Sequence, residues 1–575
     1  MSGKISPLSS SPSRGRLDAW RDRRALRAAA PVPSGFVTEP APRSIGLFAR
    51  GRQLMAGRFP YEGCTIEAPD TAPWDLSETD PAFVTAMQSF VWLDDLAAVA
   101  ERPARARAQD WAFDWIARQG MGEGPGWTPE IAGRRLLRQI NHGAFLLAGR
   151  TRAEAEAFFT TLGRQVQFLS RRWSSVPAGT GRLGALCGMV CATAMLRGLE
   201  GQTDSALAAL ATECDTLVGA DGGIASRNPE ELLETLGLLV DTASTLKSVT
   251  RTPAEGISNA IARIVPTLRL LRMPDGGLAR FHGGGCGAPG RLDAVLTASE
   301  VRTPAPDEPA MGFVRLQAAG TALVVDAAAP PAGAASARAH ASTLAFEMTS
   351  GRRPLVVNCG AGESFGPDWA LAGRASACQS TLSLEGYSSS RFGRAHKTGA
   401  GPESLLTETP DEVWTRPEDP PRRHALFGHD GYRATHGLTH LRELSLTPDG
   451  DGLHGTDTIG AMSPVDTKLT EAVLDRAGIR GIPYQLRFHL HPDVDATLDM
   501  GGWAVSMALK SGEIWIFRFD GQVDLTLAPS VWLEKGQPGP RATRQIVLSG
   551  RLLEPSQQIS WTFEKAQVTP APIRD

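Results

Sequence analysis

The spacing of apolar residues changes once along this chain, near residue 305, and that change limits the folds open to it. Before it, apolar residues recur every three or four positions, as at Leu207, Leu210 and Leu217, which is the spacing of one helix face. After it, apolar residues alternate, as at Leu344 and Phe346, which is the spacing of a strand with one buried face. The pattern predicts a helical half followed by a half built of strands.

The residues at which the predicted helices and strands begin and end limit the possible architectures of each half. Two predicted helices stop at the same turn, Asp-Gly-Gly, which begins at Asp221 and again at Asp275. Another helix is predicted to begin with Asn228 as its N-cap and Pro229 at its first position. Helices that repeatedly end in one kind of turn indicate an array of helical hairpins. Short strands separated by Gly-rich turns favour an all-β sandwich or barrel in the second half.

Length and composition set the number of domains and exclude some classes of partner. With 575 residues the chain is too long for one ordinary core. We expect a disordered basic tail over 1–40, a helical domain over 41–300 and a β domain over 301–575. The net charge of −3 gives no reason to expect a nucleic-acid partner. The sequence contains no stretch of 18 apolar residues, so it predicts no transmembrane segment. The Arg/Ser/Pro-rich start lacks the apolar core of a standard secretory signal.

Cysteine usage points away from a disulfide framework. The seven cysteines are few, odd in number and scattered along the chain. Cys187 and Cys191 share one face of a predicted apolar helix. We expect both to be small buried core residues rather than a redox or metal site.

Several longer stretches carry a family resemblance. They are AHASTLAFE (339–347), GRRPLVVNCG (351–360), STLSLEGYSS (380–389) and HDGYRATHGLTHLREL (429–444), with GWTPEIAGRRLLRQI (126–140) and DGGIASRNPEELLETL (221–236) in the helical half. In combination they resemble the bacterial branch of the heparinase II/III-like polysaccharide lyases. The resemblance implies an α+β multidomain fold in which an (α/α) toroid-like domain precedes an antiparallel β-sandwich.

The resemblance also implies a chemistry, β-elimination at a uronic acid of an acidic polysaccharide or oligosaccharide. Such a site neutralises the sugar carboxylate, removes the neighbouring proton and protonates the leaving oxygen. By position, we expect His340 and Tyr432 to transfer protons and Arg338, with Arg134 or Arg135, to bind carboxylate or sulfate. Further substrate-binding candidates are Asn358, Gln379 and His429. No cofactor is implied.

The resemblance raises the question of a metal at three of these positions. Some family members hold a structural zinc at the positions of His340, Asn358 and Gln379. Asn and Gln amides are poor zinc ligands beside carboxylate and imidazole. We therefore predict no metal there.

Two departures from the family pattern keep a second hypothesis open. The helical half has no tyrosine after Tyr61, where the family places a catalytic one, and VPAGTGRLGALCG (176–188) lacks the expected substrate-binding asparagine. Asn141-His142 resembles that motif but lies inside a predicted helix, so we interpret it as structural. The alternative function is a non-catalytic glycan-binding or cell-envelope assembly protein on the same scaffold.

Other interpretations also stay open. His340 could instead be a strand-end histidine at the surface or a hydrogen-bonded histidine at the domain interface. The Gly-rich run FHGGGCGAPG (281–290) is interpreted as a flexible interdomain lid or linker. The family meets its polymers in the periplasm or cell envelope, whereas the absence of a standard signal leaves the cytoplasm open.

Overall fold

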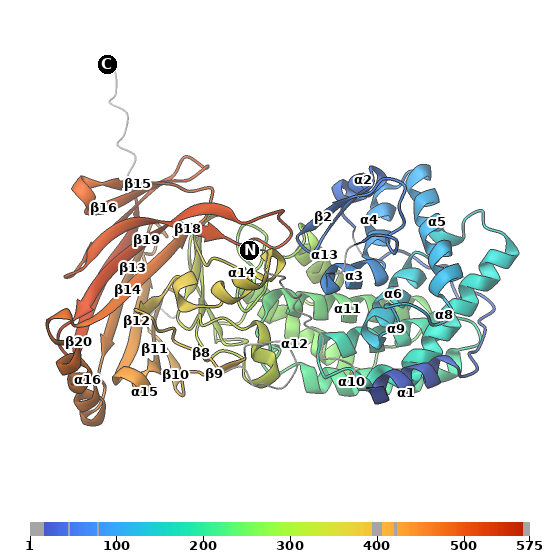
Figure 1. The fold of residues 1–575 in the computed structure, drawn as a ribbon, viewed down its shortest axis with the longest axis horizontal. Helices are drawn as coiled ribbons and strands as arrows, with labels where there is room; N and C mark the ends of the chain where they lie inside the picture. The colour runs from blue at the N-terminus through green and yellow to red at the C-terminus, as the bar shows by residue number, and fades with distance from the viewer. Residues whose placement is uncertain (1–15, 44–45, 78–79, 394–404, 419–421, 567–575) are drawn as a thin grey trace, which may run out of the picture.

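The computed structural model describes residues 16–43, 46–77, 80–393, 405–418 and 422–566. It consists of a helical half and a β half side by side, with a helix, α16 (Pro464–Ala477), at the outer end of the β half (Figure 1). This confirms the predicted fold class, a toroid-like helical domain followed by an antiparallel β-sandwich.

The helical half contains most of the helices. They are α1 (Arg16–Leu26), α2 (Phe48–Met55), α3 (Pro81–Gln88), α4 (Val91–Val99), α5 (Arg102–Gln119), α6 (Pro129–Asn141), α7 (Gly143–Leu147), α8 (Arg152–Arg172), α9 (Thr180–Met195), α10 (Thr203–Leu217), α11 (Pro229–Ser248), α12 (Glu255–Leu271) and α13 (Arg291–Ala298).

Local sequence signals explain where these helices begin. The Asn228 side chain accepts hydrogen bonds from the backbone N–H groups of Glu230 and Glu231, and Pro229 occupies the first helical position of α11, as predicted. Cys187 and Cys191 are buried in α9, and all seven cysteines are free thiols. Their predicted role as small core residues is confirmed.

The N-terminal part differs from the expected tail. Of residues 1–40, those from 16 onward are described, and 16–26 form helix α1 against α8. The Arg172 guanidinium donates to Asp22 at 2.5 Å, and Ala25 is buried. Phe36 packs edge-on against Phe159. This part of the chain is therefore packed structure, because contacts with residues far along the sequence order a segment that is basic and polar in composition.

A small hairpin interrupts the helices. Strands β1 (Arg58–Tyr61) and β2 (Cys64–Glu67) pair antiparallel within the range predicted as helical. Tyr61 is buried there, and its hydroxyl donates to Asp95 at 2.8 Å. The hairpin is thus part of the helical core rather than of the β half.

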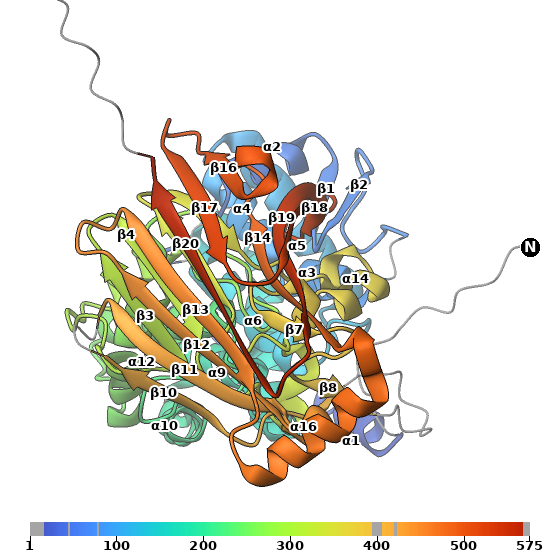
Figure 2. The same cartoon turned by 90° about the vertical axis from the view of Figure 1, so that its left-hand side faces the viewer.

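The β half has two large antiparallel sheets (Figure 2). One has the order β10-β11-β12-β13-β20-β17-β16-β15, and the other has the order β18-β19-β14-β6-β5-β4-β3, with β7 also paired to β14. Their strands are β3 (Phe313–Ala318), β4 (Thr321–Asp326), β5 (Phe346–Ser350), β6 (Arg353–Val357), β7 (Leu382–Leu384), β10 (Val413–Pro417), β11 (His424–Tyr432), β12 (Leu438–Leu446), β13 (Gly452–Gly460), β14 (Ile482–Leu490), β15 (Asp495–Asp499), β16 (Ala504–Ala508), β17 (Ile514–Asp520), β18 (Asp524–Trp532), β19 (Arg541–Leu552) and β20 (Ser556–Lys565). A separate pair is β8 (Arg391–Phe392) with β9 (Leu406–Glu408), and two short helices are α14 (Pro367–Ala372) and α15 (Arg433–His436).

Aromatic side chains join the two large sheets. Trp561 of β20 stacks on Phe346 of β5, with ring centroids 6.0 Å apart, and meets Phe488 of β14 edge-on at 4.7 Å. All three rings are buried. Burying such rings is the main source of stability for a sandwich core, because each removes a large apolar area from water.

The two halves are held together by apolar and charged contacts. Phe313 of β3 and Val324 of β4 belong to the apolar core of the helical half. Arg227, just before α11, forms an ion pair with the buried carboxylate of Asp326 at the end of β4. In the described part of the chain, no single helix is long and apolar enough to cross a membrane.

Candidate functional site

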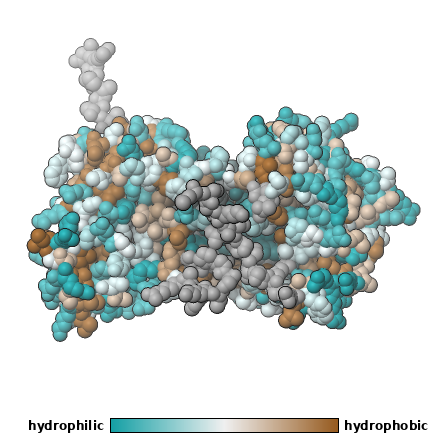
Figure 3. All heavy atoms as spheres, in the orientation of Figure 1, coloured by the Kyte–Doolittle hydropathy of each residue, from teal (hydrophilic) through white to brown (hydrophobic). Residues whose placement is uncertain are grey.

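A groove of ≈ 690 Å³ opens inside the helical half and reaches the β half. Its walls come from α6, α9, α11 and α13, and its mouth is formed by the 333–338 segment and Lys535. In the space-filling view the outline is indented at its upper edge where the halves meet (Figure 3). The volume is within the usual range for small-molecule and oligosaccharide-unit pockets.

Three of the six basic side chains that line the groove form ion pairs. Arg134 lies 2.5 Å from Glu234, and Arg138 lies 2.7 Å from Asp94. Lys535 lies 3.1 Å from the Glu230 carboxylate. Each of these cations is therefore neutralised by an acid that itself lines the groove.

The remaining charged groups of the groove, three basic and three acidic, are equal in number. Arg43, Arg291 and Arg338 have no ion pair among the described residues, while Glu231 accepts a hydrogen bond from Thr180. Burial raises the pKa of Asp241 to about 6. The lining contains six acidic and six basic side chains, so the described groove lacks the positive excess that attracts a polyanion.

His340 lies at the domain interface, not on the groove wall. It is 1% exposed, and its Nε2 accepts the backbone N–H of Gly283 at 3.1 Å. Burial lowers the pKa of His340 to about 3, so the ring is neutral. This position matches the interpretation of a hydrogen-bonded interface histidine.

His282 is the histidine that the structure adds to the groove lining. Its Nδ1 accepts the backbone N–H of His340 at 3.2 Å, and its Nε2 lies 3.3 Å from the Asp326 carboxylate. Its φ of +50° is unusual for a residue other than glycine. Burial lowers the pKa of this ring too. Nδ1 is thus taken up by a backbone N–H, whereas Nε2 lies near the Asp326 carboxylate without a hydrogen bond.

Sequence reasoning missed His282 because it stands in the Gly-rich run interpreted as a lid or linker. The structure buries Phe281, His282 and the three glycines 283–285. A Cβ on Gly284 would lie 2.6 Å from the Asn228 side chain. The glycines therefore permit close packing against α11 rather than motion, and the Phe-His pair preceding them was the only available signal.

Tyr432 is placed away from the groove. It is fully buried in the sandwich core at the end of β11, and its hydroxyl donates to the carbonyl of Leu382 at 3.0 Å. Burial raises the pKa of Tyr432 above its usual value, further from the range useful for proton transfer near neutral pH. Tyr432 and His340 do not line the groove, and no hydrogen bond or ring contact joins them among the described residues; the expected acid/base pair stays a prediction.

The three predicted arginines have three different roles in the structure. Arg134 faces the groove in its ion pair with Glu234. Arg135 is 0% exposed, donates to Gln165 at 2.9 Å and stacks over Trp115, so it is a structural residue of the helical core. Arg338 is exposed at the groove mouth and is the one best placed to meet an anion.

The other candidates are buried in the β half. Asn358 accepts the N–H of Ser380 at 2.8 Å, and Gln379 donates to the carbonyl of Gly373 at 2.8 Å. His429 Nε2 lies 3.3 Å from Nδ1 of His440. None of these three lines the groove. In the described residues no group of three or more His, Cys, Asp or Glu side chains is arranged to hold a metal ion.

Solved structures of polysaccharide lyases share this architecture. The heparinase II/III-like C-terminal family model matches residues 300–562. A solved structure of heparinase III covers 96% of this chain and 90% of its own, with a TM-score of 0.65 and 11% identity. Heparan sulfate lyase HepC of Pedobacter heparinus, in a mutant form, covers 97% and 89%, with a TM-score of 0.60 and 13% identity.

One curated relative matches along almost its whole length. FtsZ-localized protein C of Caulobacter vibrioides is 30% identical over 549 residues, which are 94% of this chain and 92% of the relative. The chain belongs to the heparinase II/III-like family. The likeness to the lyase structures is at low identity and shows the fold alone. The relative named for FtsZ is similar in sequence along most of both chains.

The family membership sharpens what is unusual about this groove. None of the four tyrosines of the chain lines it, and among the described histidines only His282 does. A lyase of this family needs a base, an acid and a partner for the sugar carboxylate around one ring. In this member Arg134, Arg138 and Lys535 of the groove lie in ion pairs, while Arg43, Arg291 and Arg338 have none among the described residues.

Proposed function

We propose that this chain is a non-catalytic cell-envelope assembly protein that keeps the scaffold of a polysaccharide lyase and localises with FtsZ. The observation that carries the proposal is the ion-paired groove. Arg134, Arg138 and Lys535 are each neutralised by a neighbouring carboxylate. A uronic-acid carboxylate can bind one of these three cations only if that ion pair separates, which loses the attraction within the pair.

The lack of a placed acid/base pair supports the same conclusion. Tyr432 is buried in the sandwich core, and Nδ1 of His282 accepts the backbone N–H of His340. A general base needs hydrogen-bond reach to the proton it removes. The relative from Caulobacter vibrioides, whose name states localisation with FtsZ, supports the localisation part of the proposal.

Two measurements on the purified full chain test the proposal. The first follows the absorbance of unsaturated products with heparin, heparan sulfate, chondroitin sulfate and alginate, with an active heparinase III as positive control. We expect no product. The second measures co-sedimentation with polymers of FtsZ from the same bacterium, and we expect the chain in the pellet only when FtsZ polymerises. Product formation, or the same pelleting without polymer, overturns the proposal.

A second candidate is a polysaccharide lyase acting on an acidic glycan. Arg338, exposed at the groove mouth without an ion pair among the described residues, favours it, because a guanidinium can bind a sugar carboxylate in a bidentate manner. If one polymer is cleaved, Arg338→Ala should raise the Michaelis constant while Tyr432→Phe leaves turnover unchanged. A loss of turnover in Tyr432→Phe at unchanged stability would contradict the placement of the site in this groove.

A further inference from the structure

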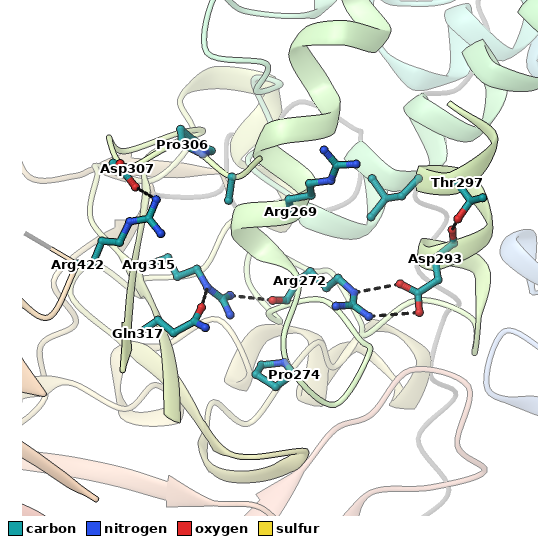
Figure 4. Close-up of a pocket in the computed structure, with 12 residues that line it drawn as sticks. Arg269, Arg272, Pro274, Asp293, Thr297, Pro306, Asp307, Arg315, Gln317 and Arg422 are labelled. Carbon is teal, nitrogen blue, oxygen red and sulfur yellow. Dashed lines mark hydrogen bonds and ion pairs between the residues drawn. The ribbon is translucent and has the colours of Figure 1, made fainter. Parts of the chain in front are cut away.

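A second cavity lies behind the groove wall. It has a volume of ≈ 760 Å³ and is bounded by the end of α12, by α13, by β3 and by the 305–307 loop (Figure 4). Helix α13 separates the two spaces: Asp293, Leu296 and Thr297 line this cavity, and Arg291, Ala294, Val295 and Ala298 line the groove. The cavity is therefore a distinct site at the junction of the two halves.

Two of the four arginines in the cavity are neutralised by carboxylates. Arg272 binds Asp293 through two nitrogens, at 3.0 and 3.3 Å. Arg422 forms an ion pair with Asp307. Among the residues that the structure describes, Asp293 and Asp307 are the only acids lining the cavity, and each is matched to one arginine.

The other two arginines have neutral partners only among the described residues. Arg315 of β3 donates to the carbonyls of Leu270 and Arg272, at 3.1 and 2.7 Å, and to the Gln317 amide oxygen at 3.0 Å. Arg269 of α12 donates to the carbonyls of Val301 and Thr303. The cavity thus holds two positive charges without a counter-charge from the protein.

This imbalance disfavours the charged form of Arg315. Burial, with the nearby Arg272, lowers the pKa of Arg315 to about 10, because the charged form is poorly solvated there. A bound anion would supply the missing counter-charge and form charge-assisted hydrogen bonds. Figure 4 shows Arg272 turned towards Asp293 and Arg422 towards Asp307, with Arg315 directed at the carbonyl of Arg272.

We infer that this cavity binds a small molecule carrying a phosphate monoester. A phosphate monoester has a charge of about −1.5 to −2 at neutral pH, which matches the two unneutralised guanidinium groups. Pro274, Leu296 and Pro306 provide an apolar wall for the body of the ligand. A volume of ≈ 760 Å³ accommodates a ligand larger than a free ion. The inference does not depend on the proposed function, because it concerns a different cavity.

Isothermal titration calorimetry of the full chain tests the inference. The probes are adenosine monophosphate and glucose 1-phosphate, with adenosine, glucose, inorganic phosphate and sulfate as controls. We expect a phosphate monoester to bind at least tenfold more tightly than sulfate, and the neutral parent compounds not to bind. No binding of either monoester at millimolar concentration, or binding no tighter than that of sulfate, overturns the inference.

Variants locate the binding. Arg315→Gln and Arg269→Gln should each weaken monoester binding at least tenfold, and Arg315→Lys should retain part of it because the charge is kept. Arg518→Gln is the matched control, since Arg518 is an exposed arginine of β17 paired with Glu564. Equal binding by the Arg315→Gln, Arg269→Gln and Arg518→Gln proteins overturns the assignment to this cavity. If a variant fails to fold, the comparison of monoesters with neutral parents on the unchanged protein decides.

Discussion

At the scale of single residues, a side chain of a type that often serves in catalysis can have a purely structural position. Tyr432 stands in a loop-like sequence rich in His, Asp and Gly, yet it continues β11 and ends in the sandwich core. Its hydroxyl satisfies the carbonyl of Leu382. Residue type alone could not distinguish a tyrosine that transfers protons from one that makes a structural hydrogen bond, because either can stand beside a turn.

Tyr432→Phe should therefore act on stability and not on the groove. The substitution keeps the ring and removes one buried hydrogen bond, which costs about 1 kcal/mol of the free energy of unfolding. Urea denaturation of both proteins measures this difference, and Tyr387→Phe, at a partly exposed ring, is the matched control with little change expected. An unchanged unfolding midpoint for Tyr432→Phe would contradict the assigned hydrogen bond.

Buried carboxylates give the chain a defined sensitivity to acid. Asp457 is fully buried between the strands, and although burial opposes its ionisation, the Arg442 guanidinium and His440 hold its pKa at about 2. Its pKa in the unfolded chain is about 3.9. Because the folded pKa is the lower one, this stabilisation is complete above about pH 4 and is lost as the pH falls towards 2.

We expect Asp457→Asn to flatten the pH dependence of stability between about pH 4 and 2. It should also lower stability at neutral pH, because Arg442 then stays buried without a counter-charge. Thermal unfolding across this pH range measures both effects. Asp204→Asn, at an exposed ion pair, is the control and should follow the unchanged protein. Parallel pH curves for Asp457→Asn and the unchanged protein would contradict the expectation.

At the scale of elements, local signals predicted what lies close in sequence and missed what depends on distant partners. The start of α11 was readable, because Asn228 and Pro229 act on the residues that follow them directly. Helix α1 was not, because its buried partner, Arg172, lies 150 residues away from Asp22. The alternation of strands was equally local, which is why the β half could be predicted as strands but its sheet order could not.

The docking of α1 gives a prediction for one element. Asp22→Asn removes the charge that faces Arg172, while Arg172 keeps a weaker contact with Asp18 at 3.2 Å. We expect amide hydrogen exchange over 16–26 to become faster, with little change in the global unfolding temperature, because a terminal helix opens locally. Asp215→Asn on α10 serves as the control. Unchanged exchange in α1 would show that its apolar contacts, such as that of Ala25, hold it without the ion pair.

At the scale of the whole molecule, the family resemblance predicted the scaffold correctly, while the groove chemistry depends on pairs that no linear pattern reveals. Arg134 meets Glu234 across 100 positions, and Lys535 meets Glu230 across the domain junction. The arginines alone predicted an anion site; the glutamate that neutralises Arg134 lies on another helix. The sequence therefore indicated the fold, and only the folded charge pattern shows how the groove differs from a polyanion site.

This charge pattern can be altered by design. In Glu231→Gln/Glu234→Gln, two carboxylates leave the groove and Arg134 loses its closest partner, keeping only Glu130 at 3.8 Å. The groove then carries an excess of two positive charges. If each charge contributes about 0.7 kcal/mol in this partly solvated site, heparin should bind the variant about tenfold more tightly than it binds the unchanged protein.

Elution from a heparin column and titration with a labelled heparin oligosaccharide at two salt concentrations measure the change. The gain should shrink at higher salt, because screening weakens exposed charges. The matched control is Glu471→Gln/Asp475→Asn on α16, which alters the net charge equally at the outer end of the β half, far from the groove. Equal heparin affinity of the groove variant and this control would mean that net charge, and not the pairing inside the groove, sets the response to polyanions. Tighter binding by the groove variant alone would show that the paired glutamates are what keeps an acidic glycan out of this member of the family.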